Sequence, residues 1–174
     1  SRVDSDERLA ERVRFVHESI GTDALVEEYI EGRELYVSAI GNERVRTLPP
    51  WELDFGSLGD TAEAIATARV KHSLEYQKKH QIDARRAEDL EPAIMRKLER
   101  TTRRVYHMLE LDGYARVDYR LTPKGELFLL EANPNPEIAE KEEFASAALV
   151  AKLSYRQLLQ RIVSLALARP VRPQ

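Results

Sequence analysis

The sequence of 174 residues predicts an α+β fold, in which antiparallel strands pack with helices. Some segments repeat apolar residues every three or four positions, which is typical of one face of a helix. Other segments alternate apolar and polar residues between turn signals, which is typical of strands. The chain has no internal repeat and no low-complexity segment, and its length suits one domain or a piece of a larger one.

The first helix is expected between a cap at Asp4 or Ser5 and a stop at Gly21. Its apolar face consists of Leu9, Val13, Val16 and Ile20. Residues 61–81 show a mixed pattern in which Ala62 to Ala68 favours helix. Further helices are expected at about 88–111, 142–152 and 154–169, the last with a Ser154 cap.

Strands are expected in two parts of the chain. The first part contains three antiparallel strands with tight connections at 24–30, 34–40 and 45–48. Residues 49–60 hold two prolines, two glycines and the only tryptophan, so we expect an ordered loop there. The second part is a hairpin within the stretch GYARVDYRLTPKGELFLLEANPNPE, residues 113–137.

Composition narrows the classes of function. Charged residues make up 33% of the chain and nearly balance at a net charge of -3, so neither a nucleic-acid nor a membrane surface is indicated. Cysteine is absent, which excludes disulfides and thiolate metal sites and favours the cytoplasm. The longest apolar run, Phe144 to Ala151, is far below the ~20 residues that span a bilayer. We therefore expect a small molecule or another protein as the partner.

The 113–137 hairpin carries polar side chains where its strands would otherwise be apolar. A two-residue turn at Lys124–Gly125 would place Asp118 directly opposite Glu131. Alternation along the strand would put Asn133 on the same face. A turn at Pro123–Lys124 keeps the two carboxylates on one face, whereas a three-residue bulged turn would separate them.

The two faces of this hairpin are expected to differ. Arg116 and Arg120 share the face of Asp118. The other face, which we expect to pack on helices, consists of Val117, Tyr119, Leu121, Phe128 and Leu130.

Two carboxylates and a carboxamide form a set of hard oxygen ligands. Such a set suits Mg²⁺, which keeps several waters and takes further ligands from phosphates. The alternative is a structural acidic pair offset by Arg116 and Arg120, which spacing alone favours. The two prolines that follow Asn133 in NPNPE argue against that alternative, because they stiffen the backbone more than a solvated strand end requires.

The hairpin GYARVDYRL…GELFLLEANPNP, together with LVEEYIEGREL and TARVKHSLEYQKKH upstream, resembles the ATP-grasp enzymes, in particular D-alanine–D-alanine ligase and its relatives. The resemblance spans nearly the whole chain. It implies an ATP-grasp fold with two lobes of antiparallel sheet packed with helices, without its N-terminal portion. Residues 1–50 would complete the smaller nucleotide-binding lobe, and residues 61–174 would form the larger metal-binding lobe.

The resemblance also implies roles for particular residues. Asp118, Glu131 and Asn133 would bind two Mg²⁺ ions, with Mn²⁺ as an alternative, on the phosphates of ATP. Arg116 would stabilise the transferred phosphate and the developing oxyanion. The implied nucleotide contacts are Glu27, Glu28 and Ile30 at the adenine, Glu34 at the ribose, Leu130 at the adenine and Lys71 at the phosphates. Simple alternation turns Leu130 away from Glu131, so its role requires a bulge or a strong twist.

The implied reaction is the activation of a carboxylate by ATP to an acylphosphate, followed by attack of an amine to give an amide, ADP and phosphate. A complete family member also has an N-terminal domain, a strand with another nucleotide-binding lysine and a phosphate loop. The resemblance places the start of this chain after that loop, so we expect a part of a longer protein that is inactive alone and docks on its missing domain. A homodimer is left open.

One departure from the resemblance concerns the amine substrate. Where D-alanine–D-alanine ligases have a glycine and a carboxylate-binding serine, this chain has Glu137 and either Glu142 or Glu143. A carboxylate cannot donate a hydrogen bond to another carboxylate, which makes D-alanine doubtful as the amine. Alternative hypotheses are a non-catalytic nucleotide-binding or scaffold fragment and an ATP-grasp enzyme with another acceptor.

Overall fold

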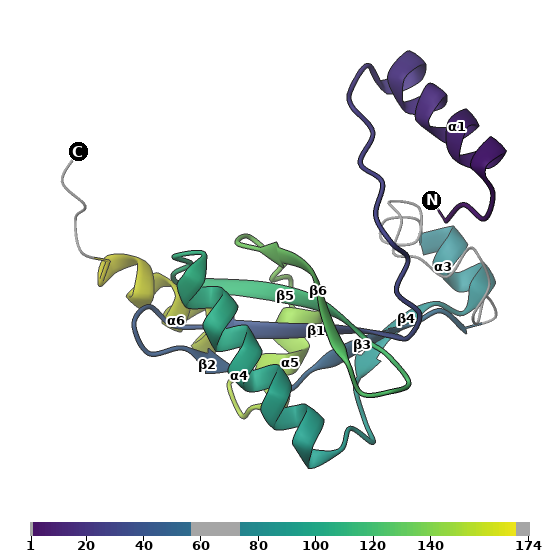
Figure 1. The fold of residues 1–174 in the computed structure, drawn as a ribbon. Coiled ribbons are helices and arrows are strands. Elements are labelled where there is room, and N and C mark those ends of the chain that lie inside the picture. Colours follow the sequence, from purple (N-terminus) through teal and green to yellow (C-terminus); the bar gives the residue numbers. More distant parts are fainter. Residues whose placement is uncertain (1, 57–73, 170–174) are drawn as a thin grey trace. The chain divides into compact units, whose positions relative to one another are not determined.

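The computed structural model describes residues 2–56 and 74–169 (Figure 1). The chain divides into two compact units. Unit 1 comprises residues 1–30 and 55–83, and unit 2 comprises residues 31–54 and 84–174.

Unit 1 begins with the expected helix. Helix α1 (Asp6–Phe15) starts after Ser5, whose side chain accepts a hydrogen bond from the Arg8 backbone N–H at 3.3 Å. It continues as a π-helical turn, η1 (Val16–Ile20), and ends at Gly21 in the left-handed conformation with φ 75°. The predicted start and end of this helix are confirmed.

The remainder of unit 1 differs from the expectation in one element. Residues 23–31 form neither helix nor strand, so the strand predicted at 24–30 is wrong. A strand needs a neighbour to satisfy its backbone groups, and no described strand pairs with this segment. Helix α3 (Leu74–His80) lies at the end of the mixed 61–81 segment. Residues 62–68 and Lys71 lie outside the described residues.

Unit 2 is built on an antiparallel sheet. Its strands are β1 (Arg33–Ile40), β2 (Arg46–Thr47), β3 (Trp51–Asp54), β4 (Asp83–Arg86), β5 (Tyr114–Leu121) and β6 (Leu127–Asn133). Their order is β4-β3-β1-β5-β6, with β2 beside β1, and the pairs that β1 and β5 make are antiparallel. The strands expected at 34–40 and in the hairpin are confirmed, whereas the strand expected at 45–48 shrinks to β2.

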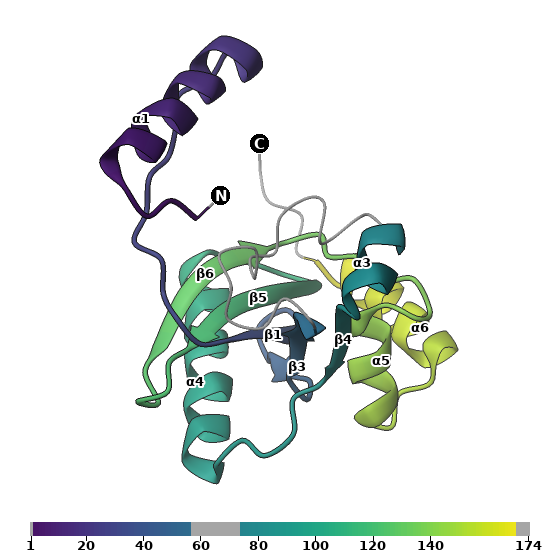
Figure 2. The ribbon, with the colours of Figure 1, turned by 90° about the vertical axis from the view of Figure 1, so that its right-hand side faces the viewer.

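Helices cover both faces of the sheet, as Figure 2 shows with α4 on the left and α5 and α6 on the right. Helix α4 (Pro92–Met108) packs Leu98 against Leu35, Val37 and Val117. Helices α5 (Glu143–Val150) and α6 (Tyr155–Leu167) cover the other face. Their apolar core includes Tyr36, Ile40, Trp51, Phe144 and Leu158. Because β1 is covered from both sides, residues 34–40 are all buried.

The C-terminal helices follow the sequence pattern closely. The cap of α6 is a capping box in which Ser154 accepts from the Gln157 backbone N–H and the Gln157 side chain accepts from the Ser154 backbone N–H. The observed bounds of α4, α5 and α6 lie within the predicted ranges. In the described ranges, no helix is long and apolar enough to cross a membrane.

The predicted loop at 49–60 is wrong in part, because residues 51–54 form β3. Trp51 pairs with Tyr36 of β1 and is buried at 8% exposure beneath α5 and α6. The preceding prolines obscure this short strand in the sequence, and only its pairing with β1 makes it regular. The sequence gives no comparable signal for β4.

The hairpin of β5 and β6 does not have the predicted turn. Leu121 pairs with Leu127, and the Thr122 backbone N–H donates to the Glu126 carbonyl oxygen at 2.9 Å, so the loop has three residues instead of two. Gly125 takes a left-handed conformation there, with φ 77°. A second irregularity lies between Asp118 and Tyr119, where β6 contains the extra residue Leu130. The extra residue in the strand compensates for the extra residue in the turn.

Candidate functional site

Polar side chains gather on the sheet face that α5 and α6 cover in part. On this face Asp118 lies between Tyr36 of β1 and Glu131 of β6, and Arg116 lies between Ser38 and Asn133. The predicted opposition of Asp118 and Glu131, and their common face with Arg116 and Asn133, are therefore confirmed as geometry. They are correct although the predicted turn is not, because the bulge restores the register.

The bulge also changes which apolar residues face the site. Phe128 pairs with Arg120 and so belongs to the polar face, and Leu130 lies beside Glu131 opposite Asp118. The prediction that Phe128 and Leu130 share the face of Val117 and Tyr119 is wrong, because the three-residue turn and the bulge reverse the alternation of side chains in this part of β6. Leu127 takes that place and packs on the α4 core.

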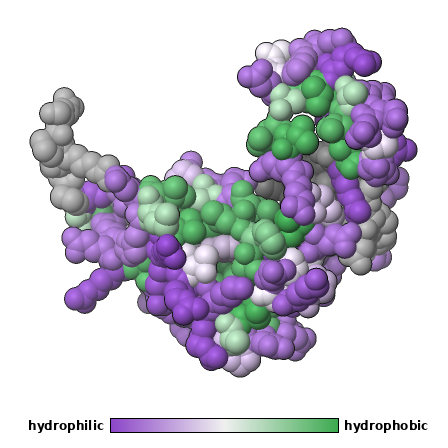
Figure 3. Space-filling view, in the orientation of Figure 1, coloured by the Kyte–Doolittle hydropathy of each residue, from purple (hydrophilic) through white to green (hydrophobic). Residues whose placement is uncertain are grey.

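This end of the sheet has an apolar surface. Phe128, Leu129 and Leu130 are 40%, 50% and 47% exposed. Figure 3 shows apolar surface over the region where Figure 1 draws β5 and β6. An exposed apolar strip beside a polar network is suited to a ligand with a flat apolar part and charged groups.

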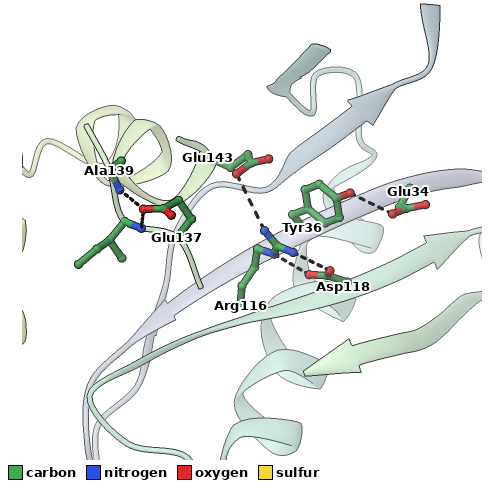
Figure 4. A network of polar contacts seen from close by, with 8 residues as sticks. Glu34, Tyr36, Arg116, Asp118, Glu137, Ala139 and Glu143 are labelled. Carbon is green, nitrogen blue, oxygen red and sulfur yellow. Dashed lines mark hydrogen bonds and ion pairs between the residues drawn. The ribbon is translucent and has the colours of Figure 1, made fainter. Parts of the chain in front are cut away.

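The centre of the polar network is a buried ion pair (Figure 4). Arg116 donates from Nε to Asp118 Oδ1 at 2.8 Å and from Nη2 to Asp118 Oδ2 at 2.9 Å. The side chains are only 11% and 4% exposed. Burial by itself would lower the pKa of Arg116, but the hydrogen bonds and charge of Asp118, with the charge of Glu143, raise it overall. Arg116 is therefore a permanent cation.

A second buried ion pair lies further along the same strands. Arg120 Nη2 lies 2.9 Å from Glu34 Oε2, and Arg120 Nη1 donates to the Gly32 carbonyl oxygen at 2.7 Å. Gly32 has φ 143°, and a Cβ there would collide with the Leu121 carbonyl oxygen, so the position requires glycine. The Tyr36 hydroxyl donates to Glu34 Oε1 at 2.9 Å. Both carboxylate oxygens of Glu34 are therefore held.

Tyr36 connects the two ion pairs. The guanidinium carbon of Arg116 lies 4.5 Å from the centre of the Tyr36 ring, which is a cation–π contact. Burial, with the negative charges of Glu34 and Asp118, raises the pKa of Tyr36. The hydroxyl therefore remains protonated and available as a donor.

The segment after β6 brings acidic residues to the network. Asn133 Oδ1 accepts from the Asn135 backbone N–H at 2.9 Å, and Glu137 Oε1 accepts from the Ala139 backbone N–H at 3.0 Å. Glu143 Oε2 lies 3.9 Å from Arg116 Nη1. Burial and the neighbouring carboxylates Glu143 and Glu137 raise the pKa of Glu142. The acidic departures noted in the sequence therefore lie at the site.

The donor set fits a divalent cation of the Mg²⁺ type. Asp118, Glu131 and Asn133 offer only hard oxygen ligands from one sheet face, and such a cation accepts the rest from water or phosphate. Across residues 2–56 and 74–169 no three His, Cys, Asp or Glu side chains cluster as a metal site. The three residues would by their chemistry supply only part of the ligand shell of such an ion.

The other predicted residues do not belong to the described part of unit 2. Glu27 and Glu28 are exposed and Ile30 is half-buried, and all three belong to unit 1. Lys71 lies outside the described residues. Unit 2 brings together Glu34, Arg116, Asp118, Leu130, Glu131 and Asn133.

Sequence reasoning missed two members of the network. Tyr36 received no role, and Arg120 was placed only on the correct face. A signal for Tyr36 was present, since it lies two residues after Glu34 on a strand and must share its face. Arg120 could be assigned only once the register of β1 and β5 placed it opposite Glu34.

Comparisons with known proteins show the family to which the chain belongs. A family model described as the C-terminus of D-ala D-ala ligase matches residues 1–164. The uncharacterized protein y4sG of Sinorhizobium fredii is 31% identical over 159 residues, or 91% of this chain and 45% of that protein. D-alanine–D-alanine ligase of Enterococcus faecalis is 31% identical over 172 residues, or 97% of this chain and 45% of that enzyme. The chain thus spans about half the length of these relatives.

Solved structures share the fold. D-alanine–D-alanine ligase from Coxiella burnetii has a TM-score of 0.75 at 20% identity and matches 95% of this chain and 40% of its own. The enzyme from Bacillus anthracis complexed with ATP has a TM-score of 0.72 at 20% identity, over 95% of this chain and 48% of its own. The architecture of unit 2 and the likeness to these structures identify the ATP-grasp fold of such ligases. The chain belongs to the family of D-alanine–D-alanine ligase C-terminal domains.

Proposed function

We propose that the protein carrying this chain is an ATP- and Mg²⁺-dependent carboxylate–amine ligase. The observation that supports this most is the buried Arg116–Asp118 pair, which faces Glu131 and Asn133 on the sheet of a D-alanine–D-alanine ligase fold. A buried cation beside a set of oxygen ligands is what the transfer of a phosphoryl group requires.

In the proposed reaction, a carboxylate oxygen of the first substrate attacks the γ-phosphorus of ATP. The bond between that phosphorus and the bridging oxygen breaks, and ADP leaves. The amine nitrogen of the second substrate then attacks the acyl carbon, phosphate leaves, and the amine loses a proton. The products are an amide, ADP and phosphate.

The residues of this chain position and neutralise charge. Arg116 uses two of its five N–H donors on Asp118 and keeps the others for oxygens of the transferred phosphoryl group. Asp118, Glu131 and Asn133 would hold the metal, with two ions as the proposed number, and the metal would supply positive charge to neutralise the phosphate oxygens. No side-chain nucleophile is required, since positioning and charge stabilisation supply the catalysis.

The nucleotide site proposed here combines polar and apolar contacts. Glu34 binds the ribose hydroxyls, and the exposed side chain of Leu130 contacts the adenine. For the residues outside unit 2 the proposal rests on the family resemblance alone, which implies adenine contacts from Glu27, Glu28 and Ile30 and a phosphate contact from Lys71. The apolar strip at Phe128 and Leu130 supports an adenine ring at this end of β6, because a flat aromatic base buries apolar surface well.

The amine substrate is proposed to differ from D-alanine. Glu143 lies near Arg116, and Glu137 already accepts hydrogen bonds from the Ile138 and Ala139 backbone N–H groups. These carboxylates repel the carboxylate of an amino acid and cannot donate to it. The acceptor is therefore an amine without a free carboxylate at this place.

The test is metal-dependent release of ADP by the intact protein. We expect Asp118→Asn and Glu131→Gln each to lower turnover by at least about 100-fold, because each removes a negative ligand from the phosphate-bound metal. Glu126→Gln, an exposed carboxylate in the same hairpin, is the matched control and should retain turnover. Unchanged turnover in both site variants would refute the assignment, and ATP binding without ADP release by the wild type would favour a non-catalytic nucleotide-binding module.

A further inference from the structure

Tyr36 contacts both buried ion pairs through different parts of one side chain (Figure 4). Its hydroxyl donates to Glu34 at 2.9 Å, and the face of its ring receives the Arg116 guanidinium at 4.5 Å. Tyr36 is itself 3% exposed and pairs with Asp118 in the sheet. Its position is therefore fixed by the strands and by packing, and it can fix the position of its neighbours.

We propose that Tyr36 is a positioning residue of the ligase reaction, whose hydroxyl orients Glu34 toward the nucleotide and whose ring orients Arg116 toward the transferred phosphate. This inference rests on the proposed function and adds a residue that the family resemblance does not assign. It predicts that the two contacts of Tyr36 control two different kinetic constants.

The contact with the hydroxyl determines how Glu34 is held. Arg120 binds Oε2 of the Glu34 carboxylate and Tyr36 binds Oε1, so the plane of the carboxylate is fixed from two sides. Removal of the Tyr36 hydroxyl takes away this donor to Oε1, so the plane of the Glu34 carboxylate is fixed less tightly. A contact between Glu34 and the nucleotide would then weaken in the ground state and in the transition state alike, which raises the KM for ATP.

The contact with the ring determines the plane of the Arg116 guanidinium. Asp118 binds Nε and Nη2 along one edge, and the Tyr36 ring covers one face. The Nη1 edge, which lies 3.9 Å from Glu143, keeps its donors. A guanidinium held along one edge by Asp118 and on one face by Tyr36 keeps its Nη1 donors oriented toward the position of the transferred phosphoryl group before that group binds. Loss of the ring removes this orientation and therefore lowers kcat.

The experiment compares Tyr36→Phe with Tyr36→Leu in the intact protein, with ADP release as the readout. For Tyr36→Phe, which keeps the ring, we expect the KM for ATP to rise about fivefold and kcat to change by less than about twofold. For Tyr36→Leu we expect a similar rise in KM and, in addition, a fall in kcat of about tenfold.

Tyr119 supplies matched controls on the opposite face of the sheet. It is as buried as Tyr36, at 0% exposure, and its hydroxyl pairs with Thr102 at 3.0 Å. Tyr119→Phe and Tyr119→Leu remove the same atoms from the same sheet, so they reproduce the loss of packing without touching Glu34 or Arg116. Both kinetic constants should stay within about twofold of the wild type at temperatures where the variants are folded.

A readout independent of turnover separates this inference from the proposed function. In the nucleotide-free protein, the Nε–H of Arg116 should give a slowly exchanging NMR signal that persists in Tyr36→Phe and is lost in Tyr36→Leu. If the wild type releases no ADP, the proposed function is overturned, but the NMR measurement still tests whether the Tyr36 ring holds Arg116. A persistent signal in a folded Tyr36→Leu variant, or a Tyr36→Phe variant with unchanged KM, would overturn the role of Tyr36.

Discussion

The two faces of the unit 2 sheet are made by the same strands and have opposite characters. Toward α4, β1 and β5 present Leu35, Val37, Val117, Tyr119 and Leu121, all buried against an apolar helix face. Toward α5 and α6, the alternate residues of the same two strands include Glu34, Tyr36, Arg116, Asp118 and Arg120, which are held by hydrogen bonds and ion pairs. One strand therefore supplies the core with every second residue and the site with the others.

This difference predicts how substitutions should behave. On the α4 face, a change should lower the free energy of unfolding and leave the kinetic constants of the folded enzyme intact. On the site face, a substitution should alter the kinetic constants. It should lower the free energy of unfolding only where it removes the ion-pair partner of a buried charge.

The largest effect is expected at Arg116. Arg116→Met leaves the Asp118 carboxylate buried without its guanidinium, so we expect a loss of about 3 to 5 kcal/mol in the free energy of unfolding. Turnover should fall by at least about 100-fold, because the transition-state cation is gone. Urea unfolding and ADP release measure the two effects.

A double variant sharpens this prediction. Arg116→Met combined with Asp118→Leu removes the stranded charge, so stability should recover toward the wild type while turnover stays lost. If the double variant is no more stable than Arg116→Met, the stability of this face does not depend on the ion pair.

The next effect is expected on the α4 face. Leu98 is 1% exposed and packs on the sheet from α4, so Leu98→Ala should lower the free energy of unfolding by about 2 to 5 kcal/mol. The KM for ATP should not change at temperatures where the variant is folded. A large change in KM would show that the two faces are not independent.

A smaller effect is expected from the polar contact on the α4 face. Thr102→Val removes the partner of the Tyr119 hydroxyl, and we expect a cost of about 1 kcal/mol in chemical denaturation. Burial raises the pKa of Tyr119 to about 12, so the hydroxyl stays protonated at neutral pH and its loss of a partner is not relieved by ionisation. If Thr102→Val leaves the free energy of unfolding unchanged, a water has replaced the threonine hydroxyl as the partner of Tyr119.

The smallest effect is expected at Glu142, at the edge of the site face. Its pKa is raised from 4.5, so the native state disfavours its charge and Glu142→Gln should slightly stabilise the protein at pH 7. The advantage should disappear as the pH falls below 4.5, where the carboxyl is protonated in both states. Thermal unfolding across this range tests the sign, and a constant difference in Tm would contradict it.

Much of the site could be predicted from the alternation of side chains along the hairpin. That period places Asp118, Glu131, Asn133 and both arginines on one face. The turn and the pairing of the β6 residues next to it could not be predicted in this way, because Thr122, Pro123 and Gly125 permit more than one loop length. The error in the turn and the bulge at Leu130 compensate, so the predicted pair of Asp118 and Glu131 is correct while the assignment of Phe128 is wrong.

Local sequence therefore determined the helices, their caps and the common face of the charged residues, since these depend on the period of the backbone and on neighbours a few positions away. Only the tertiary structure decided that Trp51 lies in a strand, that Arg120 pairs with Glu34 and that Tyr36 joins the two ion pairs. Each of these depends on which strands lie side by side. That choice is made by the burial of both sheet faces, to which residues distant in sequence contribute together.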